Sequence, residues 1–81
     1  VDLERANLSG ARLVEADLRG ANLRGVNFTD ADLKNADLRD ADLYRADFTN
    51  ADLRDARLEG ALLDSTDFTG AIGAKLEAAH E

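Results

Sequence analysis

The chain has 81 residues, with 17 acidic and 10 basic side chains and a formal net charge of −7. So short a chain forms one domain at most, and a conventional globular core would be small. The absence of cysteine excludes disulfides and thiolate chemistry, and the absence of a long apolar run excludes a membrane span. The acidic balance argues against direct binding of nucleic acid.

Residues 1–70 repeat with a period of five. Every fifth residue from Leu3 to Phe68 is Leu or Phe, in all 14 units. The residue two positions earlier is Ala in 11 of the 14 units. The residue between them is Asp or Asn in 11 of 14, and the exceptions are Arg12, Arg57 and Leu62. The repeat is therefore Ala-(Asp/Asn)-(Leu/Phe)-x-x.

This period fits a short strand followed by a corner. On an α-helix, five residues advance a side chain by about 500°, so the leucines would spiral around the axis without forming a stripe. In a strand, side chains alternate between faces, so Ala and Leu point inward and the Asp or Asn between them points outward. The last two positions turn the chain, and Gly, Asp and Asn are common there because they suit turns.

The phenylalanines indicate how many corners close one coil. Phe28, Phe48 and Phe68 are spaced by 20 residues, which is four pentapeptides. The residues that follow this column are also alike, namely Ser9, Thr29, Thr49 and Thr69. We therefore predict four sides per coil and about three and a half coils, with the three phenylalanines stacked in the core.

The pattern of residues 1–70 resembles the pentapeptide repeat family. The resemblance implies an all-β fold, the right-handed quadrilateral β-helix, in which the Leu or Phe and the preceding Ala stack inside. It also implies a protein that is not an enzyme.

The period fails after Gly70, because Gly73 stands where Leu or Phe is due. Residues 71–81 contain good helix formers, and we expect a short helix that caps the last coil. No such segment precedes Leu3 in the sequence. We therefore expect an open N-terminal coil, which is covered either by a segment of a longer protein or by a second copy in an end-to-end homodimer.

The sequence offers little support for catalysis or for a bound cofactor. His80, the only histidine, is the penultimate residue, where we expect it to be solvated. Acidic columns such as Asp32 and Asp52 lie on a convex wall, which cannot supply the six to eight oxygen ligands of a Ca²⁺ site. We expect no catalytic residue, no metal site and no cofactor.

We therefore expect a structural or protein-interaction module that contacts neither nucleic acid nor membrane directly. The candidate contact residues are Tyr44 and Leu62, because apolar and aromatic side chains at outward positions favour binding. For Leu62, contact with the C-terminal tail is an equal alternative. The alternative is an acidic DNA mimic, since some family members act in this way on DNA gyrase. However, eight of the 17 acidic residues only fill the Asp position of the repeat. Cytoplasm is our default compartment, with a lumenal or periplasmic one as the alternative.

Overall fold

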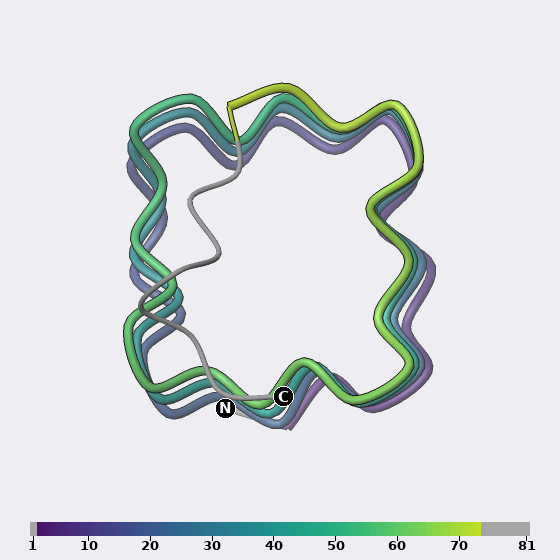
Figure 1. Cartoon of the computed structure of the whole chain (residues 1–81), viewed down its shortest axis with the longest axis vertical. Coiled ribbons are helices and arrows are strands. Elements are labelled where there is room, and N and C mark those ends of the chain that lie inside the picture. Colours follow the sequence, from purple (N-terminus) through teal and green to yellow (C-terminus); the bar gives the residue numbers. More distant parts are fainter. Residues whose placement is uncertain (1, 74–81) are drawn as a thin grey trace.

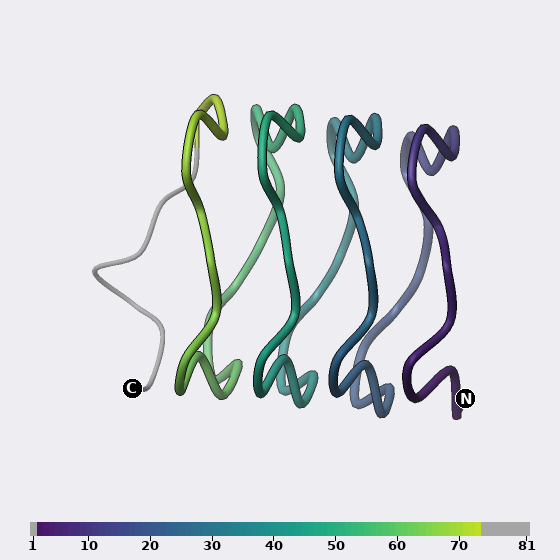
Figure 2. The same cartoon turned by 90° about the vertical axis from the view of Figure 1, so that its right-hand side faces the viewer.

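The structure, a computed structural model, describes residues 2–73. Viewed down its axis, the chain follows a nearly square path, and the successive coils lie almost in register (Figure 1). The chain runs anticlockwise as it approaches the viewer, which makes the coil right-handed. Figure 2 shows the coils stacked side by side along the axis. The stack is nearly as long as it is wide, with extents of 24 × 24 × 22 Å.

Each coil contains 20 residues. Parallel β-bridges join the Asp/Asn position of one unit to the same position 20 residues later, from Asp2–Asn22 to Asp52–Ile72. These bridges are isolated, and residues 2–73 contain neither a longer strand nor a helix. The predicted four-sided coil is therefore confirmed.

We number the four sides in chain order, by their inward residues. Side 1 carries Leu3, Leu23, Leu43 and Leu63, and side 2 carries Leu8, Phe28, Phe48 and Phe68. Side 3 carries Leu13, Leu33 and Leu53, and side 4 carries Leu18, Leu38 and Leu58.

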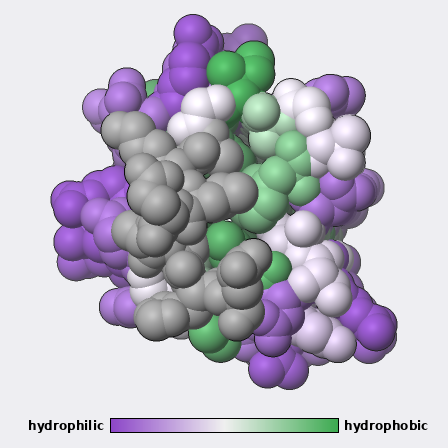
Figure 3. Space-filling view, viewed as in Figure 1, coloured by the Kyte–Doolittle hydropathy of each residue, from purple (hydrophilic) through white to green (hydrophobic). Residues whose placement is uncertain are grey.

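The core is a column of alanine and leucine or phenylalanine side chains. From Ala21 to Leu63, every residue at these two inward positions is buried, with at most 8% of its surface exposed. The inward residues of the first coil are only half-buried, because the described residues pack on them from one end alone. Viewed along the axis, hydrophobic residues lie near the middle of the end face and hydrophilic ones around much of its perimeter (Figure 3).

Every backbone N–H group of an inner repeat has a partner, as residues 46–50 show. Ala46 N–H donates to the Leu43 carbonyl across the corner, at 2.9 Å. The N–H groups of positions 47, 48 and 50 donate to carbonyls of the neighbouring coils, at 2.7–2.9 Å. The remaining one, of Thr49, donates to Oδ1 of Asp47 at 2.9 Å. The outward Asp or Asn therefore completes the backbone hydrogen bonding of its own corner.

The backbone conformation at the corners explains which residue types occupy the last position of the repeat. The fifth residue of every unit from Arg5 to Gly70 has a positive φ, between 59° and 76°. This left-handed conformation costs most residues about 1–2 kcal/mol, whereas glycine adopts it freely and Asn and Asp tolerate it. The preference for Gly, Asn and Asp at this position follows directly.

The coil continues to Ile72, whose backbone pairs with that of Asp52. The chain then bends at Gly73, where φ is 74°. Ala71 and Ile72 therefore belong to the coil and not to a helix. The rest of the predicted capping helix, with His80, lies outside the described residues. No helix in the described part of the chain is long and apolar enough to cross a membrane.

Candidate functional site

Side 1 departs most from the repeat. On sides 2 to 4, the left-handed corner residues are Gly, Asn or Asp with the single exception of Glu15. On side 1, three of the four are of other types, namely Arg5, Arg45 and Ser65. A φ of 61° is unfavourable for arginine, so the backbone conformation does not explain why Arg5 and Arg45 occupy these corners.

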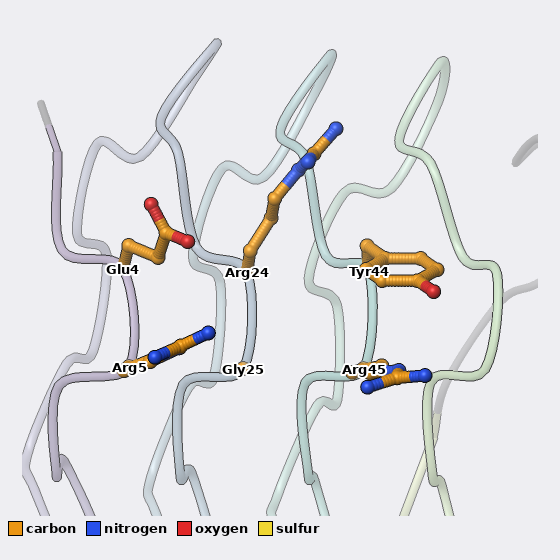
Figure 4. A pocket seen from close by; sticks show the side chains of 6 residues that line it. All are labelled: Glu4, Arg5, Arg24, Gly25, Tyr44 and Arg45. Atoms are coloured by element: carbon orange, nitrogen blue, oxygen red, sulfur yellow. The ribbon is translucent and has the colours of Figure 1, made fainter.

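Tyr44 lies beside this corner column and is 36% exposed. Cζ of Arg45 lies 5.2 Å from the centre of the Tyr44 ring, and Cζ of Arg24 lies 5.6 Å from it. Both distances are within the range of a cation–π interaction. Figure 4 shows the Arg45 guanidinium alongside the ring. The aromatic side chain predicted from sequence is therefore surrounded by cationic groups, and the arginines are what the sequence reasoning missed.

These side chains line a shallow pocket of about 220 Å³. Its floor is Gly25, and its walls are Glu4 and Arg5 on one side and Tyr44 and Arg45 on the other, with Arg24 alongside (Figure 4). A Cβ atom on Gly25 would lie 3.3 Å from Cγ of Arg5, because the Arg5 side chain passes over the glycine. A side chain at position 25 would therefore fill part of the pocket.

The three arginines of the pocket differ in their pairing. Nε of Arg24 donates to Oδ2 of Asp42 at 2.5 Å, and this hydrogen bond raises the pKa of Arg24. Within residues 2–73, neither Arg5 nor Arg45 forms an ion pair. The only nearby acid of the pocket, Glu4, accepts a long hydrogen bond of 3.5 Å from the Asn22 amide.

Arginines elsewhere on the coil are held by the repeat itself. Arg19, Arg39 and Arg54 each donate to the aspartate two positions earlier, with Nη2–Oδ2 distances of 2.9, 2.6 and 2.7 Å. These hydrogen bonds lower the pKa of each partner to about 2; the partners are Asp17, Asp37 and Asp52. Such carboxylates stay ionised at neutral pH, the opposite of what a general acid requires.

Leu62, the other predicted contact residue, also lies on side 1 and is 46% exposed. Leu62 occupies the column of outward Asp and Asn residues on this side. It lies one coil after Tyr44, and its column is next to the column that contains Tyr44. Wherever this position holds Asp or Asn, its Oδ1 accepts the N–H of the residue two positions on, as Asp42 does for Tyr44 at 3.2 Å. Leucine cannot accept this bond, so Leu62 exchanges a hydrogen bond of the fold for an exposed apolar surface.

Among residues 2–73, the other exposed apolar side chains do not form a patch. Val14 and Ile72 are 47% and 53% exposed, and both lie on side 3. They belong to the first and last coils, so the height of the stack separates them. The described residues contain no group of three or more side chains able to hold a metal ion.

Comparison with known proteins identifies the repeat. A family model described as pentapeptide repeats, in eight copies, matches residues 2–40 and 41–72. No curated protein matches the sequence.

Several solved structures resemble the coil. The pentapeptide repeat protein Rfr23 of the cyanobacterium Cyanothece 51142 is 33% identical, with a TM-score of 0.88 over 98% of this chain and 52% of its own. A pentapeptide repeat protein of the Arabidopsis thaliana thylakoid lumen is 32% identical, with a TM-score of 0.59 over 86% of this chain and 59% of its own.

HetL, a pentapeptide repeat protein involved in heterocyst differentiation regulation in the cyanobacterium Nostoc PCC 7120, is 38% identical, with a TM-score of 0.57. That match covers 98% of this chain and 38% of HetL. The chain spans about half the length of Rfr23 and less of HetL.

Proposed function

Because the chain belongs to the pentapeptide repeat family, we propose that it is a non-enzymatic interaction module that binds a partner protein through side 1. The observation that carries this proposal is the concentration on one side of residues that the repeat does not require. Tyr44, Leu62, Arg5 and Arg45 all replace or interrupt residue types that serve the fold elsewhere.

The chemistry of these residues suits a protein interface. Tyrosine and arginine are enriched among the residues that contribute most to binding, and aromatic rings bury much area at little cost in conformational entropy. The extents of 24 and 22 Å give one side roughly 500 Å². A stable interface buries about 800 Å² per partner. We therefore expect a weak complex, or a partner that reaches around a corner onto a neighbouring side.

A photo-crosslinking amino acid at position 44 tests this proposal in an extract of the source cells. The matched control is position 34, which has the same place in the repeat but lies on the opposite side, side 3. We expect a discrete adduct from position 44 alone. Excess wild-type chain should compete for it, and excess chain carrying Tyr44→Ala and Leu62→Asn should not. Equal adducts from both positions, or none from position 44, would contradict a binding side 1.

The N-terminal coil supports a second contact, an end-to-end homodimer. The inward residues Leu8, Leu13 and Leu18 are half-buried, whereas Leu33 and Leu38 in the next coil are fully buried. A second copy stacked on this end would cover the exposed part of the first coil. Light scattering should then give twice the monomer mass for the wild-type chain and the monomer mass for Leu13→Glu. A wild-type chain that is monomeric at every concentration would contradict the homodimer.

The alternative function, an acidic DNA mimic, has one supporting observation, the net charge of −7. The extent of 22 Å along the stack corresponds to about six base pairs at ~3.4 Å each. Several of the acidic side chains are paired with arginines of the same repeat, which reduces the charge they present. Inhibition of DNA gyrase supercoiling at micromolar concentration would favour the mimic over the interaction module.

A further inference from the structure

We propose that the pocket over Gly25 binds a carboxylate of an acidic segment in the partner protein, with Arg5 and Arg45 as its two cationic contacts. This inference rests on the proposed function, because it names the chemistry by which side 1 recognises its partner. Figure 4 shows the arrangement, with the two arginines on either side of the glycine.

Arg5 and Arg45 occupy the same corner position two coils apart, so their backbones lie about 10 Å from each other. Gly25 stands between them without a side chain, and the pocket has this residue as its floor. The two arginine side chains start from either side of this gap. That of Arg5 extends over the glycine, whereas that of Arg45 extends away from it beside the Tyr44 ring, so a change of the Arg45 rotamer brings both to one ligand above the gap (Figure 4). The planar guanidinium matches a carboxylate through paired hydrogen bonds.

Arg5 and Arg45 form no ion pair with another described residue, although Arg45 contacts the Tyr44 ring. Arg19, Arg39 and Arg54 neutralise aspartates of their own repeats, and Arg24 pairs with Asp42. Within the described residues, only Arg12 shares with Arg5 and Arg45 the lack of an ion pair. Two of these three arginines therefore line a single pocket, on a chain whose net charge is negative.

The lining of the pocket favours a peptide carboxylate as the ligand. The Glu4 carboxylate also lines the pocket, and it would repel a doubly charged phosphate more strongly than a single carboxylate. The same carboxylate can accept a backbone N–H of a bound peptide. The Tyr44 ring offers an apolar face to the methylene groups of a Glu side chain. Nucleic acid is disfavoured because its binding needs cationic contacts to several successive phosphates, and the pocket offers two arginines without an ion pair among the described residues.

The variants Arg5→Gly and Arg45→Gly test the proposal without harm to the fold, because glycine suits the left-handed corner. The probe is a capped hexaglutamate peptide, and a capped hexaglutamine peptide is the neutral reference. The matched control variant is Arg12→Gln, which removes the other unpaired arginine, on side 3. Amide chemical shifts of the full chain, followed by NMR during titration, report both the location and the Kd of binding.

We expect hexaglutamate to shift the amide signals of residues 4–5, 24–25 and 44–45 in a saturable way, and hexaglutamine to leave them unchanged. The double variant should weaken the Kd at least about tenfold, the cost of one charge-assisted contact, and Arg12→Gln should leave it unchanged. An increase in ionic strength should weaken the wild-type Kd.

Four results would overturn the proposal. These are no shift with hexaglutamate, shifts centred on another side, binding that survives the double variant, and an equal response to inorganic phosphate at the same concentration. If hexaglutamate fails while position 44 still crosslinks to a partner, side 1 binds a partner of different chemistry. If position 44 also fails to crosslink, the proposed function itself is wrong.

Discussion

Phe48 stacks face to face on Phe28, with ring centres 4.7 Å apart and ring planes inclined by 8°. Phe68 continues the stack at 5.2 Å and 3°. The separation is close to the spacing of hydrogen-bonded strands, about 4.8 Å, because each ring belongs to the same position of the next coil. Identical side chains therefore pack on one another in the last three coils of side 2, above Leu8. The stability of the coil depends on such contacts between neighbouring coils.

Truncation of the central ring tests this packing. Phe48→Ala should lower the free energy of unfolding by about 3–5 kcal/mol, because it leaves a cavity between two coils that cannot collapse. Denaturant unfolding followed by circular dichroism measures the loss. Phe48→Leu is the control, since leucine occupies this position in most units, and it should cost clearly less. An Ala variant as stable as wild type would contradict the stacked core.

The outward aspartate should stabilise its corner through Oδ1. Asp47→Ala removes the acceptor of the Thr49 N–H and should cost about 1 kcal/mol. Asp47→Asn keeps an oxygen at the same place, as Asn27 does one coil earlier, and should cost much less. Thermal unfolding of both variants makes the comparison. Equal losses would mean that the charge of Asp47, and not its hydrogen bond, stabilises the corner.

The left-handed corner should prefer glycine wherever no partner is involved. Glu15→Gly should raise the free energy of unfolding by about 1 kcal/mol, because φ at this residue is 61°. Gly20→Ala should lower it by a similar amount through strain alone, since no atom lies within 4 Å of the added Cβ. Glu15→Ala is the control and should change little. A destabilised Glu15→Gly variant would show that the corner strain has been overestimated.

The stability of the coil should fall in acid. The Arg39 guanidinium lowers the pKa of Asp37 to about 2, below the ordinary value of 3.8. A carboxylate with a lowered pKa stabilises the fold above pH 3.8, and this contribution disappears as the pH falls towards 2. Asp37→Asn removes the charge but retains an acceptor for the Arg39 N–H. Its melting temperature should therefore fall less than that of wild type between pH 5 and pH 2. If the melting temperatures of Asp37→Asn and wild type fell equally over this pH range, the stabilising role of the Asp37–Arg39 ion pair would be contradicted.

Much of the fold could be predicted from the sequence, because each position of the repeat has one structural role. The inward position of Leu33 and the outward position of Asp32 follow from the alternation of side chains along a strand. The 20-residue length of the coil follows from the spacing of Phe28 and Phe48. The site could not be predicted in the same way. Arg5, Arg24 and Arg45 are far apart in the sequence, and they become neighbours only when the coil brings every twentieth residue together.

A signal for the site was nonetheless present in the sequence. Arg5 and Arg45 stand in the fifth position of the repeat, where Gly, Asn and Asp predominate. This departure has meaning only once the positive φ of that position is known, and a repeat pattern does not reveal dihedral angles. Exposed residues such as Tyr44 could be found because they break a polar pattern. The pairing of Arg24 with Asp42 required the side-chain geometry.

In the proposed binding site, Arg5 and Arg45 are retained for binding and at a cost to the fold. The melting temperature of the chain with both Arg5→Gly and Arg45→Gly tests this claim most directly. We expect an increase of roughly 4–8 °C. Each relieved corner contributes about 1 kcal/mol, and the lost contact of Arg45 with the Tyr44 ring offsets up to about 1 kcal/mol. A net gain of about 1 kcal/mol has this effect in a chain of this size. A melting temperature equal to or below that of wild type would show that these arginines stabilise the coil, and would remove the main reason to place a binding site on side 1.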